Sequence, residues 1–115
     1  MEREELEYFA RQLQERKEQL FRQIKQYEEE LHDIQREMPA DSKDAAPWER
    51  RQHLLRCFIG EDRAEIQQIE QALRKIENGT YGICEECGEP IPKKRLQVRP
   101  LVLYCVQCQE ELERF

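Results

Sequence analysis

Four of the chain's five cysteines form two CxxC pairs, Cys84 with Cys87 and Cys105 with Cys108, with seventeen residues between the pairs. In a CxxC pair both sulfur atoms can point to one centre, and a glycine such as Gly88 lets the backbone turn tightly around it. Two pairs supply four thiolates, the ligand set of a structural zinc site. Because four protein sulfurs leave no position for water or substrate, the pattern predicts one zinc ion that organises the fold.

Disulfide bonds and a redox-active CxxC are the alternatives for these cysteines. Disulfides need an oxidising compartment, whereas the chain begins MEREELEYFARQL, which is charged and lacks the apolar run of a signal peptide. A thioredoxin-like CxxC needs strands before it, and no segment before Cys84 reads as a strand. We therefore expect a reduced, cytoplasmic protein with a structural zinc site.

The composition excludes several classes of protein. Charged residues make up 38% of the 115 residues and aromatic residues 8%, which suits long solvated helices better than a thick globular core. The net charge of −6 disfavours nonspecific attraction to nucleic acid, so we expect a protein partner and no direct DNA binding. No stretch is apolar enough to span a membrane. Because no nucleophile with a base, open metal site or phosphate loop is present, we do not expect an enzyme.

Residues 3–38 contain no Pro or Gly and consist mainly of good helix formers. Apolar residues follow one heptad frame through this segment, and Lys17 is the only charged residue in the seam. A helix of this length extends on the order of 50 Å. With a single apolar edge, widened by Phe9 and Phe21, it needs a partner helix. The predicted seam residues are Leu6, Ala10, Leu13, Lys17, Leu20, Ile24, Tyr27, Leu31, Ile34 and Met38.

A second apolar stripe between Trp48 and Ile76 predicts that partner helix, which Asn78 and Gly79 terminate. Two helices joined by a short connection run antiparallel. The expected fold is all-α: a long antiparallel coiled-coil hairpin over residues 1–79, then a four-cysteine zinc finger and short C-terminal helix over residues 80–115. Asp62 interrupts the second stripe at a seam position, and its partner is not fixed by the sequence. The predicted stripe contains Trp48, Leu55, Ile59, Ile66, Ile69, Leu73 and Ile76.

The turn of the hairpin, residues 39–47, carries Asp41 and Asp44 beside small residues that include Ala46. One interpretation is structural: Asp44 caps the second helix and Asp41 supports the turn. The other is functional: two carboxylates on a narrow tip, at the end of a rigid hairpin, act at a site that the rest of the protein cannot reach. Both interpretations remain open from the residues alone.

The pattern CxxCG…IP…RL…RP…CxxCQ in residues 81–109, preceded by the tip sequence DxxDxA, resembles the DksA/TraR family of bacterial transcription regulators. The resemblance covers residues from about 30 to 110. It implies that the chain binds RNA polymerase and inserts the hairpin tip into the secondary channel to modulate initiation. It also implies zinc ligation by Cys84, Cys87, Cys105 and Cys108, and a polymerase-acting tip formed by Asp41, Asp44 and Ala46.

Larger family members bind the nucleotide ppGpp through basic side chains, and this chain departs from that pattern. Arg99 matches one of those positions, but Gln68 and Gln109 stand at two others. Neutral amides cannot replace the charge-assisted bonds that lysines make to phosphates. We therefore expect weak or absent ppGpp coupling.

A basic group, Lys93, Lys94, Arg95 and Arg99, leaves a second function open. These side chains could contact polymerase or nucleic acid, or they could offset the negative charge of a zinc ion bound by four thiolates. The alternative function is a zinc-ribbon module that binds nucleic acid or protein through this group, with the hairpin used for dimerisation. The polymerase-binding interpretation instead predicts a monomer.

The remaining predictions concern the secondary structure of the finger and the fifth cysteine, Cys57. Leu96, Val98, Leu101 and Leu103 alternate around Arg99 and Pro100, which predicts a small hairpin in the finger, followed by a closing helix from Gln109 to Phe115. Cys57, like His32 and His53, lies off the predicted seam. We expect Cys57 to be a partly exposed thiol outside the zinc site.

Overall fold

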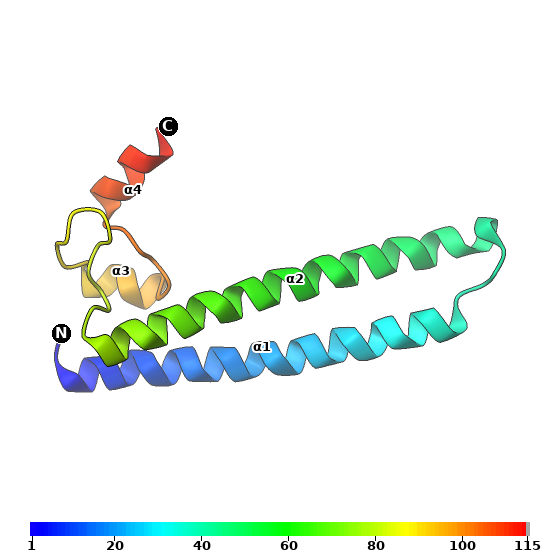
Figure 1. Ribbon diagram of the computed structural model, residues 1–115, viewed down its shortest axis with the longest axis horizontal. Coiled ribbons are helices and arrows are strands. Elements are labelled where there is room, and N and C mark those ends of the chain that lie inside the picture. Colours follow the sequence, from blue (N-terminus) through cyan, green and yellow to red (C-terminus); the bar gives the residue numbers. More distant parts are fainter. Residues whose placement is uncertain (115) are drawn as a thin grey trace. The chain divides into compact units, whose positions relative to one another are not determined.

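The computed structural model describes residues 1–114 and is mostly helical (Figure 1). In this part of the chain the only β pairing is an isolated antiparallel bridge between Ile83 and Pro90. The all-α prediction is therefore confirmed. The helices are α1 (Arg3–Glu37), α2 (Ser42–Asn78), α3 (Lys93–Val98) and α4 (Val106–Glu113).

The chain forms two compact units, which we describe separately. The coil unit, Glu15–Gln67, contains most of α1 and the larger part of α2. The finger unit combines Met1–Gln14 with the residues from Gln68 onward, and so contains the start of α1, the end of α2 and both short helices.

Within the coil unit α1 and α2 run antiparallel and side by side (Figure 1). Except for Ala45, their buried side chains come from the predicted seams, because residues three and four apart share one face of a helix. Phe21 is a correction: it is 51% exposed and does not widen the seam of α1. The buried apolar residues of this unit are Leu20, Ile24, Ile34, Ala45, Leu55, Ile59 and Ile66.

Bidentate ion pairs show which residues face each other across the two helices. Arg16 donates to both carboxylate oxygens of Glu65, at 2.7 and 3.2 Å. Arg51 donates to both carboxylate oxygens of Glu30, at 2.9 and 3.0 Å. These partners, 49 and 21 residues apart, give the register that the sequence left open.

The start of α2 differs from the expectation that Asp44 is its cap. The helix begins at Ser42, the Asp41 carbonyl accepts from Ala45 N at 2.9 Å, and the Asp41 carboxylate accepts from Lys43 N at 3.0 Å. Asp41 is therefore the N-cap, and Asp44 lies in the first turn, where a carboxylate faces the positive end of the helix dipole. Pro47 lies inside α2 and does not delay its start.

α2 ends as the sequence predicted. Gly79 has φ +76°, a conformation that favours glycine. Thr80 N donates to Lys75 O at 2.9 Å and Gly79 N to Ile76 O at 3.3 Å, the pair of bonds that defines a Schellman motif. This turn leads the chain from α2 into the finger.

The finger unit has a small apolar core in which Phe9, at the start of α1, packs against Tyr81 with ring centroids 5.5 Å apart. The predicted hairpin around Arg99 and Pro100 is wrong, because Lys93–Val98 forms α3. Leu96 is fully buried on that helix, whereas Val98 is 80% exposed. The closing helix runs over Val106–Glu113, and Phe115, where we expected it to end, lies outside the described residues.

Candidate metal centre and acidic turn

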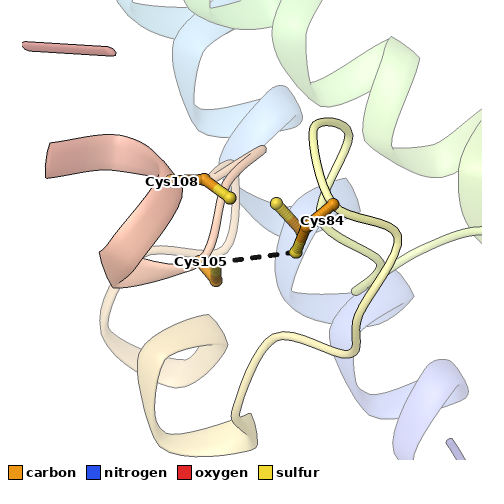
Figure 2. A group of neighbouring side chains, drawn as sticks. Cys84, Cys105 and Cys108 are labelled. Carbon is orange, nitrogen blue, oxygen red and sulfur yellow. Dashed lines mark hydrogen bonds between the residues drawn. The ribbon is translucent and has the colours of Figure 1, made fainter. Parts of the chain in front are cut away.

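The side chains of Cys84, Cys87, Cys105 and Cys108 converge, and their sulfur atoms all lie within 4.8 Å of one another. Figure 2 shows the sulfur atoms of Cys84, Cys105 and Cys108 gathered between the loop of the first CxxC pair and the start of α4. The sulfurs of Cys87 and Cys105 are 3.9 Å apart. Zn–S bonds of about 2.3 Å require tetrahedral sulfurs about 3.8 Å apart. The group therefore fits a zinc ion.

Short-range backbone bonds shape the first half of this group. Gly88 N donates to Cys84 O at 3.0 Å, and Gly88 has φ +76°, so the chain reverses immediately after Cys87. Cys84 N donates to Glu89 O at 2.9 Å, and the bridge between Ile83 and Pro90 closes the loop. Because Gly88 allows this tight turn, the side chains of Cys84 and Cys87 can point to the same centre.

The second pair is positioned by a helix. Cys105 is the N-cap of α4, and its carbonyl accepts from Gln109 N at 2.9 Å. Cys108 lies in the first turn of α4, so the two side chains are three residues apart on one face. The two halves are linked where Glu85 N donates to Leu103 O at 2.9 Å.

The pKa values of the thiols in this group are shifted in opposite directions. A hydrogen bond from the Cys87 backbone N–H lowers the pKa of Cys84 to about 6, whereas a hydrogen bond with Cys105 raises the pKa of Cys108. Clustered thiolates repel one another, and a divalent cation offsets that repulsion. The arrangement is suited to a metal that is bound by all four sulfurs.

Two of the four basic residues, Lys93 and Arg95, make contacts within the finger unit. The Lys93 ammonium lies 2.6 Å from a carboxylate oxygen of Glu5 in α1. Arg95 Nε donates to the Tyr104 carbonyl at 3.2 Å, next to the ligand Cys105. These two residues therefore stabilise the finger unit itself. Lys94 and Arg99 are exposed.

At the predicted tip the structure brings the acidic residues to one helix start. The side chains of Asp41 and Asp44 are both exposed. Ala45 is 4% exposed and belongs to the coil core, whereas Ala46 is half-buried. The sequence analysis did not identify Asp41 as the cap, although its position before a helix-forming SKDAA segment is the signal that could have found it.

Cys57 is not part of the four-cysteine group. Cys57 is exposed on α2, as expected, and belongs to the coil unit. The sequence analysis did not identify Tyr81, yet Tyr81 is 6% exposed and its hydroxyl donates to the Pro100 carbonyl at 2.9 Å.

Among the described residues, no helix is long and apolar enough to cross a membrane.

This chain is similar to several bacterial transcription factors. A model of the prokaryotic DksA/TraR C4-type zinc finger matches residues 79–114. The RNA polymerase-binding transcription factor DksA of Caulobacter vibrioides is 39% identical over 112 residues, which cover 96% of this chain and 77% of that protein. The structure of transcription factor DksA2 from Pseudomonas aeruginosa matches with a TM-score of 0.90 and 29% identity, over 99% of this chain and 87% of DksA2.

These matches define the class as a DksA-like regulator, which is not an enzyme. The chain belongs to the DksA/TraR family. An uncharacterized protein of Aquifex aeolicus is 41% identical over 91 residues, and the matched segment spans 63% of that relative's length.

Proposed function

We propose that this protein binds RNA polymerase and modulates initiation by inserting the turn of its helical hairpin into the secondary channel. The observation that carries the proposal is the exposed pair Asp41 and Asp44 at the start of α2. Membership of a family whose curated members include RNA polymerase-binding factors supports the partner. In this proposal the exposed carboxylates act near the active centre, and Ala46 keeps the turn narrow.

The test is a purified transcription reaction at a promoter that responds to the wild-type protein. Asp44→Asn, and less strongly Asp41→Asn, should remove the effect on transcription while leaving polymerase binding intact, because an amide on an exposed side chain costs little structure. Asp33→Asn is a matched control, since Asp33 is an exposed aspartate of α1 that pairs with Arg36 on its own helix. Normal regulation by both tip variants would contradict the proposal.

We also propose that the finger binds one zinc ion through Cys84, Cys87, Cys105 and Cys108, and that this zinc is structural. Four thiolates complete a tetrahedral shell, so the ion when bound supplies no open coordination position. Its contribution is to hold the loop of the first CxxC pair against α4. Metal analysis after gel filtration should find one zinc per chain, and light scattering in the same run should report a monomer.

The response to ppGpp is expected to be weak or absent. Gln68 contributes to a pocket of about 170 Å³ in the finger unit, and Gln109 donates to Glu113 at 3.1 Å. Neither side chain offers a positive charge to a phosphate. In a titration with polymerase, ppGpp should change the half-maximal concentration of this protein by less than about tenfold. A larger change would contradict this expectation.

The alternative nucleic-acid-binding function has less support. Lys93 and Arg95, two of the four basic residues that it requires, already contact Glu5 and the Tyr104 carbonyl. The chain's net charge of −6 also opposes attraction to a phosphate backbone. Lys94 and Arg99 remain as exposed cations, and we propose that they contact the polymerase surface.

A further inference from the structure

A second pair of metal-binding side chains lies outside the four-cysteine group. Cys57 and His53 are one helical turn apart on α2, and Cys57 Sγ lies 3.6 Å from His53 Nε2. Both residues are exposed and both belong to the coil unit. Neither residue has a role in the proposed metal centre or in the acidic turn.

The distance between these two atoms is the one that a shared metal ion would require. A tetrahedral ion bound about 2.3 Å from a thiolate and about 2.0 Å from an imidazole places the sulfur and nitrogen about 3.5 Å apart. Residues at i and i+4 of a helix project from the same face, so α2 holds the pair in place before any ion arrives. We propose that His53 and Cys57 form a second metal site, a bidentate chelate for Zn²⁺ or a similar borderline cation.

The surroundings define what kind of site this is. Glu49 precedes His53 by four residues and Glu61 follows Cys57 by four, and both carboxylates are exposed on α2. They place negative charge on either side of the pair, although Arg50 and Arg56 partly offset it. Among the described residues the only group of three or more ligands within reach of one ion is the four-cysteine group. Water would therefore complete the coordination shell at His53 and Cys57.

Because this site offers only two protein ligands and is open to solvent, we expect its metal ion to exchange readily. It should be bound more weakly than a zinc ion in the four-cysteine site. Thiolate and imidazole ligands favour Zn²⁺, Cu²⁺, Ni²⁺ and Co²⁺ over Mg²⁺ or Ca²⁺. When the ion binds, the thiol proton is released to solvent and the sulfur–metal bond replaces the S–H bond. The finger cysteines are not needed for this reaction, so the inference does not rest on the proposed function.

The test is a Co²⁺ titration of the full-length, zinc-loaded protein under a non-chelating reductant. Co²⁺ binds such ligands more weakly than Zn²⁺, so the finger keeps its zinc and the signal reports the second site. A thiolate bound to Co²⁺ gives a charge-transfer absorption band in the near ultraviolet. We expect this band to saturate at one added Co²⁺ per chain in the wild-type protein. It should be absent from Cys57→Ser.

The role of the imidazole is tested by His53→Ala, which should weaken Co²⁺ binding at least about tenfold. His32→Ala is the control, because His32 is an exposed histidine on α1 of the same unit. Cys57→His should retain Co²⁺ binding, measured by calorimetry, and lose the band. A wild-type titration without a saturable band, or equal affinity in wild-type protein and His53→Ala, would overturn the proposal.

Discussion

The Tyr81 hydroxyl donates a hydrogen bond of 2.9 Å to the Pro100 carbonyl and so joins the segment before the first CxxC pair to the segment that leads to the second. The ring is 6% exposed and packs against Phe9. Tyr81→Phe keeps this packing but leaves the Pro100 carbonyl without its donor. We expect the free energy of unfolding of the finger unit to fall by about 1 kcal/mol in denaturant titrations.

Tyr8→Phe is the control for that measurement. The Tyr8 side chain is 45% exposed, and its hydroxyl can be hydrated in both the folded and the unfolded state. Its substitution should change the stability by less than about 0.5 kcal/mol. Equal effects of the two substitutions would show that the bond from Tyr81 does not stabilise the finger.

The same tyrosine predicts a dependence on alkaline pH. Burial raises the pKa of Tyr81 from 10.0 to about 12. Between these two values the unfolded chain loses the phenolic proton and the folded chain keeps it, so stability falls as the pH rises. The difference in unfolding free energy between wild type and Tyr81→Phe should therefore change by about 2–3 kcal/mol from pH 10 to pH 12. Wild-type protein should lose its advantage over the variant. A difference that is constant over this range would contradict the burial of the phenol.

Asp41 has a structural role that can be separated from its proposed role in transcription. Its carboxylate accepts from Lys43 N at 3.0 Å, so Asp41→Ala removes the cap of α2 and should destabilise the coil unit by about 1 kcal/mol. Asp41→Asn should retain the stability, because asparagine caps helices as well as aspartate does. Asp44→Ala should cost less, since Asp44 interacts with the helix start mainly through its charge. Thermal unfolding followed by circular dichroism distinguishes these variants, and equal stability of Asp41→Ala and wild type would rule out the cap.

Asp62 is expected to weaken the coil unit. One of its carboxylate oxygens is buried without a hydrogen-bond partner in the described structure. Burial, together with the charge of Glu65, raises the pKa of Asp62 above 3.8, and the charge of Arg16 only partly opposes this. Asp62→Leu should therefore raise the free energy of unfolding at pH 7 by about 1–2 kcal/mol. Glu61→Leu, at the exposed neighbouring position, should not.

The pH dependence of Asp62 has a defined sign. Because the folded-state pKa is the higher one, the folded protein takes up the proton first as the pH falls. The cost of the buried charge is then relieved, so the advantage of Asp62→Leu should shrink as the pH falls through the folded-state pKa. An advantage that grows with acidity would contradict this account.

The features that repeat along the chain were predictable from sequence. Most of the buried face of α1 was predicted, with Phe21 as the exception, because apolar spacing directly reflects the face of a helix. The cysteine spacing likewise indicated the four residues whose sulfurs converge. In both cases the pattern is local, so no knowledge of distant contacts was needed.

The failures concern residues whose state depends on tertiary contacts. Leu96 and Val98 alternate as in a strand, yet they lie on the short helix α3, where Leu96 is covered by the rest of the finger unit. The turn was expected to extend over residues 39–47, but a cap at Asp41 lets α2 begin at Ser42. The contacts of Lys93 with Glu5, 88 residues away, and of Tyr81 with Pro100 have no periodic signal in the sequence.

Removal of zinc should destabilise the finger unit much more than the coil unit. Structural zinc sites contribute roughly 10 kcal/mol or more of apparent folding energy, so a chelator should unfold the region from Tyr81 onward. The coil unit has its own buried seam and ion pairs such as Arg16–Glu65, and we expect it to remain helical. Hydrogen exchange should then show fast exchange in the finger and retained protection in residues 20–66. Cys84→Ser should reproduce this pattern, whereas Cys57→Ser should keep the finger protected. Loss of protection in both units after chelation would mean that the hairpin depends on the metal.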